Sequence, residues 1–168
     1  MVPGSSRRPG RAPPRQRAGR GPGLTLTLAE PRWLRAVRGV EARARRAAAA
    51  AARAARLGAP ISLLLADDAT LSGLNARHRR RDAATNVLSF PSAAGGGDVA
   101  LALGVVLREA RRLGVPIAHH FAHLVVHGTL HLAGRDHATP REARRMEREE
   151  AAVLRRLGIP DPYRRRGR

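Results

Sequence analysis

The chain has 168 residues, enough for one domain around a single hydrophobic core and too short for two ordinary domains. It contains no cysteine, so disulfides are excluded and any metal ion must be held by nitrogen and oxygen atoms. All 32 basic residues are arginines, and 13 acidic residues leave a formal net charge of +19, which favours a polyanionic partner such as nucleic acid.

Arginine, proline and glycine dominate the first 23 residues, which include no acidic residue. This segment has almost no apolar surface to bury, so we expect a disordered extension at residues 1–23. A short basic tail is expected at residues 164–168. No apolar run is long enough for a membrane span, and none follows the N-terminal arginines as in a signal peptide. We therefore expect a soluble protein without a membrane partner, and the absence of cysteine fits a cytoplasmic one.

A single domain is expected at residues 24–163, and it begins with alternating apolar residues in LTLTL. This alternation predicts a half-buried strand at residues 24–28. Residues 33–57 have apolar side chains at helical spacing and predict one helix. The continuous apolar run at residues 61–65 predicts a strand that is covered on both faces. Either Asp67 or Asp68 then caps the next helix.

The middle of the chain predicts a hairpin. Two strands are expected at residues 85–91 and 98–103, and the AAGGG turn that joins them indicates antiparallel neighbours. Helices follow at residues 105–113 and 116–134, each ended by a glycine.

The last helix has a clear start signal. Thr139, Pro140 and Glu142 form a capping box with proline at the first helical position. The order of elements predicts an α/β (α+β) fold in which about five helices pack around a small, four-stranded, mostly parallel mixed sheet.

Three histidines in HGTLHLAGRDH have the spacing of a metal site. His127 and His131 are four residues apart on the predicted helix, so their rings share one face with Cβ atoms about 6 Å apart. Gly134 permits a left-handed turn that brings His137 back to them. The pattern HxxxHxxGxxH is the one used by zincin-like metallopeptidases. Three ligands leave the fourth tetrahedral position open, so we predict one catalytic Zn²⁺.

Neighbouring residues can support these ligands. His123 lies one turn before His127, but its ring is a full turn farther from the third histidine, so we expect it to orient a ligand or to pack. Asp136 can orient a ligand imidazole or stabilise the turn, and both roles stay open. His119 and His120 are expected at ordinary polar positions.

Gly128 stands where HExxH peptidases carry their general base. Glycine cannot abstract a proton, so peptide hydrolysis by that route is disfavoured. A bound metal can lower the pKa of water from about 15.7 toward 7, which leaves hydrolysis of an activated or anionic substrate.

Two blocks of sequence carry a family resemblance. LNARHRRRDAATNVLSFP (residues 74–91) is similar to LNxxYRxxDxPTNVLSFP, and HLVVHGTLHLAGRDH (residues 123–137) to HLxVHGxLHLxGYDH. These patterns belong to the YbeY family of single-strand-specific endoribonucleases, bacterial factors in ribosomal RNA maturation. GDV at residues 97–99 and DPY at residues 161–163 also resemble the family pattern.

The resemblance implies roles for individual residues. The three clustered histidines resemble the zinc ligands, and Arg79 resembles an arginine that lines the site. A guanidinium can grip a scissile phosphate and offset the charge on its non-bridging oxygens, so Arg79 and His127 are taken as catalytic. The residues expected to bind substrate are Arg79, Thr85, Asn86 and Ser89.

The chain departs from the family pattern at three positions near the site. His78 replaces a tyrosine, Ala84 a proline, and Arg135 the tyrosine of the metal loop. None of them is an expected ligand, and Arg135 could add a phosphate contact.

The resemblance implies a zinc-dependent endoribonuclease that acts on single-stranded ribosomal RNA. It also implies maturation of the 16S rRNA 3′ end, a role in ribosome quality control, and contacts with the small ribosomal subunit and assembly factors. Two alternatives stay open: a non-catalytic assembly factor that binds pre-rRNA, and a metallopeptidase-like hydrolase with an unconventional base. The sequence also leaves open whether water or the 2′-hydroxyl attacks phosphorus.

Overall fold

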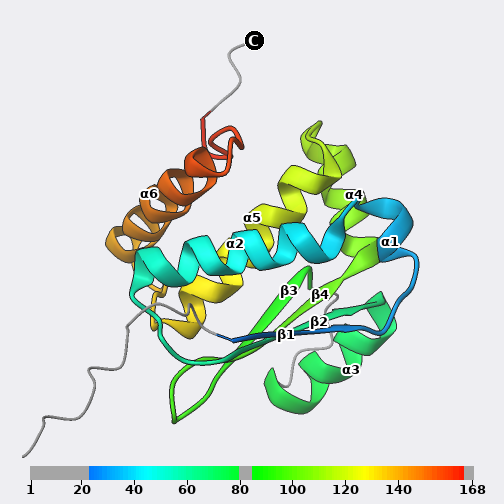
Figure 1. Cartoon of the computed structure of the whole chain (residues 1–168), viewed down its shortest axis with the longest axis horizontal. Helices are drawn as coiled ribbons and strands as arrows, with labels where there is room; N and C mark the ends of the chain where they lie inside the picture. Colours follow the sequence, from blue (N-terminus) through cyan, green and yellow to red (C-terminus); the bar gives the residue numbers. More distant parts are fainter. Residues whose placement is uncertain (1–22, 80–84, 165–168) are drawn as a thin grey trace, which may run out of the picture.

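The computed structural model describes residues 23–79 and 85–164 (Figure 1). Apart from Gly23 and Arg164, the expected N-terminal extension and basic tail lie outside the described residues. The same holds for the side chains of His78 and Arg79 and for residues 80–84, which include two of the neighbouring arginines and Ala84.

Four strands form one mixed sheet in the order β1-β2-β4-β3. They are β1 (Leu24–Leu28), β2 (Ile61–Ala66), β3 (Val87–Pro91) and β4 (Gly97–Ala102). β1, β2 and β4 are parallel, whereas β3 runs antiparallel to β4, its partner in the predicted hairpin. The predicted four-stranded, mostly parallel sheet is therefore confirmed.

Six helices are present in the described part of the chain. They are α1 (Trp33–Ala36), α2 (Val40–Ala55), α3 (Asp68–Arg79), α4 (Leu103–Leu113), α5 (Ile117–Leu132) and α6 (Pro140–Arg156). The single helix expected at residues 33–57 is two helices, which is why there are six instead of about five. The first helix ends before Val37, which is extended, and Gly39 with a φ of 66° forms the N-cap of the second. The buried indole of Trp33, the first residue of α1, donates to the Ala66 carbonyl at 3.1 Å.

The helices cover both faces of the sheet (Figure 1). α2 and α5 pack on one face in the larger core, which includes Leu63 and Val99. α3 covers the other face in a smaller core with Leu71 and Leu88. α6 packs against α2 and α5, and its predicted capping box at Thr139 and Glu142 is confirmed. None of the described helices combines the length and apolarity that a membrane span requires.

α5 lies between the sheet, α2 and α6 and is mostly buried. A line of partly exposed side chains at every fourth position runs along it: His119, His123, His127 and His131. Residues 124–126 and 128–130 between them are buried. The fold therefore presents one row of imidazoles from an otherwise enclosed helix.

Candidate metal centre

Three imidazoles converge at the C-terminal end of α5. The ring nitrogens of His127, His131 and His137, the three-histidine cluster, lie within 4.8 Å of one another. His127 Nε2 and His131 Nε2 are 3.1 Å apart. Two nitrogens bound to one tetrahedral zinc at 2.0–2.1 Å would be about 3.3 Å apart, so this pair already has ligand spacing. Within the described residues no fourth histidine, aspartate or glutamate joins the cluster, so a tetrahedral ion held by these three ligands would keep one position for water or substrate.

A turn after α5 carries His137 to the cluster. Gly134 has a φ of 75°, as the sequence predicted for a left-handed turn. Asp136 Oδ1 accepts a hydrogen bond from the backbone N–H of His137 at 2.7 Å. This contact is the turn-stabilising one of the two roles that the sequence left open for Asp136.

Arg135 ties the same turn to α6. Its Nε donates to Glu149 Oε2 at 2.9 Å and its Nη2 to Glu149 Oε1 at 3.2 Å. A third bond runs from Nη1 to the Ala133 carbonyl at 3.3 Å. The guanidinium that we considered for phosphate contact is thus engaged in a bidentate pair that holds the metal loop.

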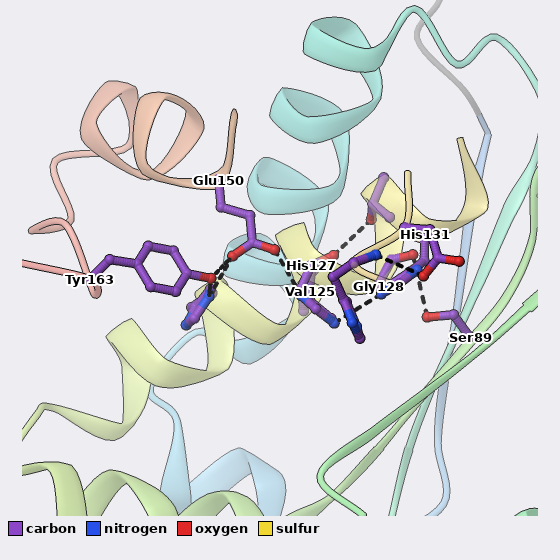
Figure 2. Close-up of polar contacts among 11 residues, drawn as sticks. Ser89, Val125, His127, Gly128, His131, Glu150 and Tyr163 are labelled. Carbon is purple, nitrogen blue, oxygen red and sulfur yellow. Dashed lines mark hydrogen bonds and ion pairs between the residues drawn. The ribbon is translucent and has the colours of Figure 1, made fainter. Parts of the chain in front are cut away.

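Glu150 is the most important residue that the sequence did not reveal. It lies on α6, is 1% exposed, and its Oε1 is 2.7 Å from His127 Nδ1 (Figure 2). Its Oε2 is 2.8 Å from His123 Nε2 and also accepts from the Tyr163 hydroxyl. An ionised carboxylate only accepts, so Nδ1 of His127 carries the proton. The Nε2 lone pair then faces His131 and is available for a metal.

A signal for Glu150 was present in the sequence. Met146, Val153 and Leu154 are the other buried residues of α6, and Glu150 shares their spacing of three and four residues. An acidic residue at a core position of an amphipathic helix requires a buried partner.

The pKa values of Glu150 and His131 favour an ionised carboxylate and one neutral imidazole in the site. Burial by itself raises the pKa of Glu150, but the hydrogen bonds from its three partners outweigh burial and lower the pKa to about 2. Burial, together with the neighbouring rings of His127 and His137, lowers the pKa of His131 to about 4. At neutral pH Glu150 is therefore charged, and His131 offers an unprotonated nitrogen.

Gly128 packs against the sheet and leaves no room for a side chain. A Cβ atom at this position would lie 2.6 Å from Val99 Cγ1 and 3.2 Å from Ser89 Oγ. Ser89 Oγ donates to the Gly128 carbonyl at 3.4 Å, and Figure 2 shows the two residues facing each other. The glutamate of an HExxH peptidase would not fit here, which gives a steric reason for glycine.

The residues predicted to bind RNA lie at and before β3. Thr85 Oγ1 donates to a backbone carbonyl two residues along at 3.3 Å, and Asn86 Nδ2 donates to Glu109 Oε2 at 2.8 Å. Ser89 is buried against α5. Arg79 is the last residue of α3, and its side chain lies outside the described residues. A role of these four residues in substrate binding stays a prediction.

His120 differs from the ordinary polar position that the sequence suggested. It is buried, and its Nε2 lies 2.8 Å from Glu109 Oε2, the atom that also accepts from Asn86. Burial lowers the pKa of His120 against the opposing effect of Glu109. This contact is a carboxylate–histidine pair made by a second carboxylate, and it lies near the N-terminal end of α5.

Comparison with known proteins agrees with this geometry. A family model described as Endoribonuclease YbeY matches residues 34–158. The chain belongs to the YbeY family. The matched region contains the whole three-histidine cluster and Glu150, whereas Tyr163 lies just beyond it.

Relatives named Endoribonuclease YbeY align with much of the chain. One from Rhodopseudomonas palustris is 49% identical over 116 residues, which cover 63% of this chain and 61% of the relative. One from Chelativorans is 48% identical over 116 residues, 64% of this chain and 71% of the relative. One from Rhizorhabdus wittichii is 41% identical over 157 residues, 80% of this chain and 93% of the relative. The chain thus spans less than two thirds of the first relative and nearly all of the last.

A solved structure shares the fold of this YbeY family member. The solution structure of TM1509 from Thermotoga maritima matches 86% of this chain and 99% of its own, with a TM-score of 0.51 and 19% sequence identity. At this identity the likeness concerns the fold alone.

Proposed function

We propose that this protein is a zinc-dependent endoribonuclease that cleaves single-stranded ribosomal RNA. The observation that carries the proposal is the convergence of three histidine nitrogens within 4.8 Å, in a chain of the YbeY family. The strong excess of arginine supports a polyanionic substrate.

Each residue of the site has a distinct task in this proposal. The three-histidine cluster would hold one ion, and Glu150 keeps the proton of His127 on Nδ1 so that Nε2 can coordinate. A zinc ion supplies a Lewis acid that lowers the pKa of water and offsets charge on phosphate oxygens. Arg79 would grip the scissile phosphate, and Thr85, Asn86 and Ser89 would line the groove floor beneath the RNA.

We further propose that the substrate is pre-rRNA in the cytoplasm. Maturation of the 16S rRNA 3′ end and ribosome quality control are the processes implied by the family, with the small ribosomal subunit and assembly factors as partners. The excess of arginine over acidic residues suits such a ribonucleoprotein setting.

The test is cleavage of an unstructured RNA oligomer by full-length protein without a histidine tag. Wild type should cut the RNA, and either a chelator or His127→Ala should abolish cutting. His119→Ala is the matched control, because it removes the same side chain two turns earlier on α5, and it should cut normally. Undiminished cutting by His127→Ala in chelator would defeat the proposal. The product ends identify the nucleophile, since the 2′-hydroxyl leaves a cyclic 2′,3′-phosphate and water leaves a linear one.

Two further outcomes would replace the proposal with another function. If no metal-loaded preparation cuts RNA but Arg79→Ala weakens RNA binding, the protein is a non-catalytic assembly factor. If casein is cut and RNA is not, it is a peptidase with an unconventional base. The packed backbone at Gly128 argues against the peptidase, because it excludes the usual carboxylate.

A further inference from the structure

The C-terminal DPY residues have no task in the reaction described above, yet they lie beside the metal centre. After α6, Leu157 and Ile159 pack against the main core and fix the path of the chain. Asp161 Oδ1 then accepts from the backbone N–H of Tyr163 at 2.9 Å. This turn directs the tyrosine side chain toward α5, as Figure 2 shows.

Tyr163 meets the carboxylate that holds a metal ligand. Its hydroxyl donates to Glu150 Oε2, the same oxygen that lies 2.8 Å from His123 Nε2. The rings of Tyr163 and His123 are edge to face, with centroids 5.6 Å apart. Because a carboxylate is planar and rigid, two donors on Oε2 set the direction of Oε1, which lies 2.7 Å from His127 Nδ1.

We propose that Tyr163 is a positioning residue for the metal ligand His127 and that it acts through Glu150. The C-terminal turn thereby completes the metal site from outside the helix that carries two of its ligands. The inference rests on metal binding as set out in the proposed function, and it adds that residues 161–163 govern the strength of that binding. Partners that orient a ligand histidine typically change metal affinity about 10–100-fold.

A purely structural role for the tyrosine hydroxyl predicts different behaviour. Tyr163 is 40% exposed, so Tyr163→Phe keeps the ring and removes little packing. The pair of Glu109 and His120 supplies a matched control, because its oxygen–nitrogen distance is also 2.8 Å but His120 is not in the three-histidine cluster. If the contacts served only to keep α5 rigid, altering either pair would weaken zinc binding by the cluster. If Glu150 and Tyr163 position His127, only changes at that pair would weaken it.

The experiment measures zinc affinity of untagged full-length protein by competition with a chromophoric chelator. Glu150→Gln should weaken binding about 10–100-fold, and Tyr163→Phe roughly 5-fold, because one of three donors to the carboxylate is lost. Glu109→Gln should bind zinc as wild type does. In the Glu150→Gln background, Tyr163→Phe should cause no further loss, since its effect passes through that carboxylate.

Three results would overturn the inference. They are wild-type affinity in Tyr163→Phe, an equal loss in Glu109→Gln, or the same loss from Tyr163→Phe with and without Glu150→Gln. If Glu150→Gln does not fold by circular dichroism, Tyr163→Phe against Glu109→Gln decides the question. Zinc affinity does not depend on cleavage, so a protein that binds zinc in the expected order but leaves RNA intact would refute only the proposed function.

Discussion

Among the carboxylate–histidine contacts of α5, those of His120 and His127 use different ring nitrogens. Near the start of the helix, Glu109 of α4 contacts His120 through Nε2 at 2.8 Å. Farther along, Glu150 of α6 contacts His127 through Nδ1 at 2.7 Å. The first contact occupies Nε2 of His120. The second leaves Nε2 of His127 facing Nε2 of His131, at 3.1 Å.

This difference teaches which histidine is available to a metal. A carboxylate beside an imidazole is common to both pairs, so its presence alone does not mark a ligand. His123 also presents Nε2 to Glu150, which agrees with a supporting role and not with coordination. What distinguishes His127 from His120 is that its Nε2 is not taken by the carboxylate and faces another imidazole.

Removal of a metal ligand should have the largest effect of the changes considered. His131→Ala should weaken zinc binding by more than about 100-fold, beyond the range for partners that only orient a ligand. His119→Ala deletes the same side chain from the same line of α5, three turns earlier, and should leave affinity unchanged. The measurement is metal content after dialysis together with chelator competition. Equal retention of zinc by both variants would contradict the assignment.

The close approach of α5 to the sheet gives the next largest effect. Gly128→Ala should lower the free energy of unfolding by about 2 kcal/mol, because its Cβ would lie 2.6 Å from Val99 Cγ1. Gly73→Ala in α3 is the control, since the nearest atom would be Arg77 Nη2 at 3.7 Å. It should raise stability by about 0.5–1 kcal/mol through helix propensity. Urea unfolding in chelator measures both, and a neutral Gly128→Ala would refute the packing argument.

Acid should lower the stability of the metal-free protein through histidines at the two ends of α5. The folded pKa of His131 is about 4, below the usual 6.5, and burial lowers the pKa of His120 as well. The unfolded chain therefore gains protons first, and stability falls as pH drops from about 6.5 toward 4, by about 1–2 kcal/mol after allowance for partial exposure.

Urea unfolding in chelator between pH 7 and pH 4.5 measures this loss of stability. This pH range stays above 4.5, the usual pKa of a glutamate. Below it, the stability that comes from the lowered pKa of Glu150 is lost as the pH falls toward 2. His131→Ala should flatten the dependence, and a slope equal to wild type would show that this residue titrates normally.

The smallest effect is expected at the pair that does not face the cluster. Glu109→Gln replaces a charge-assisted contact to His120 and Asn86 with a neutral one and should lower the free energy of unfolding by about 1 kcal/mol. Thermal unfolding in chelator measures the loss. A much larger loss of stability would mean that the contacts of Glu109 stabilise the fold more than this account expects.

Local sequence patterns predicted most of the fold and the cluster. Alternation and apolar runs predicted the strands, and the capping box predicted the start of α6. The spacing of His127, His131 and His137 with Gly134 between them was enough to predict their convergence. These features depend on residues that are close in sequence, where helix and turn geometry determines position.

Contacts between distant elements were not predictable in the same way. Glu150 meets His127 across 23 residues, and Asn86 meets Glu109 from another element. The break between α1 and α2 was not predictable from the apolar pattern either, because Trp33, Val37 and Val40 on both sides of it are all buried. Such pairings follow from packing of whole elements, which periodicity does not specify.

The most direct test of the central claim is a zinc titration of chelator-treated, untagged wild type with cleavage of an unstructured RNA oligomer as the readout. Cutting should be absent at the start, rise in proportion to added zinc, and stop rising at one equivalent per chain. Cutting without metal, or no cutting after full loading of the three-histidine cluster, would contradict the account.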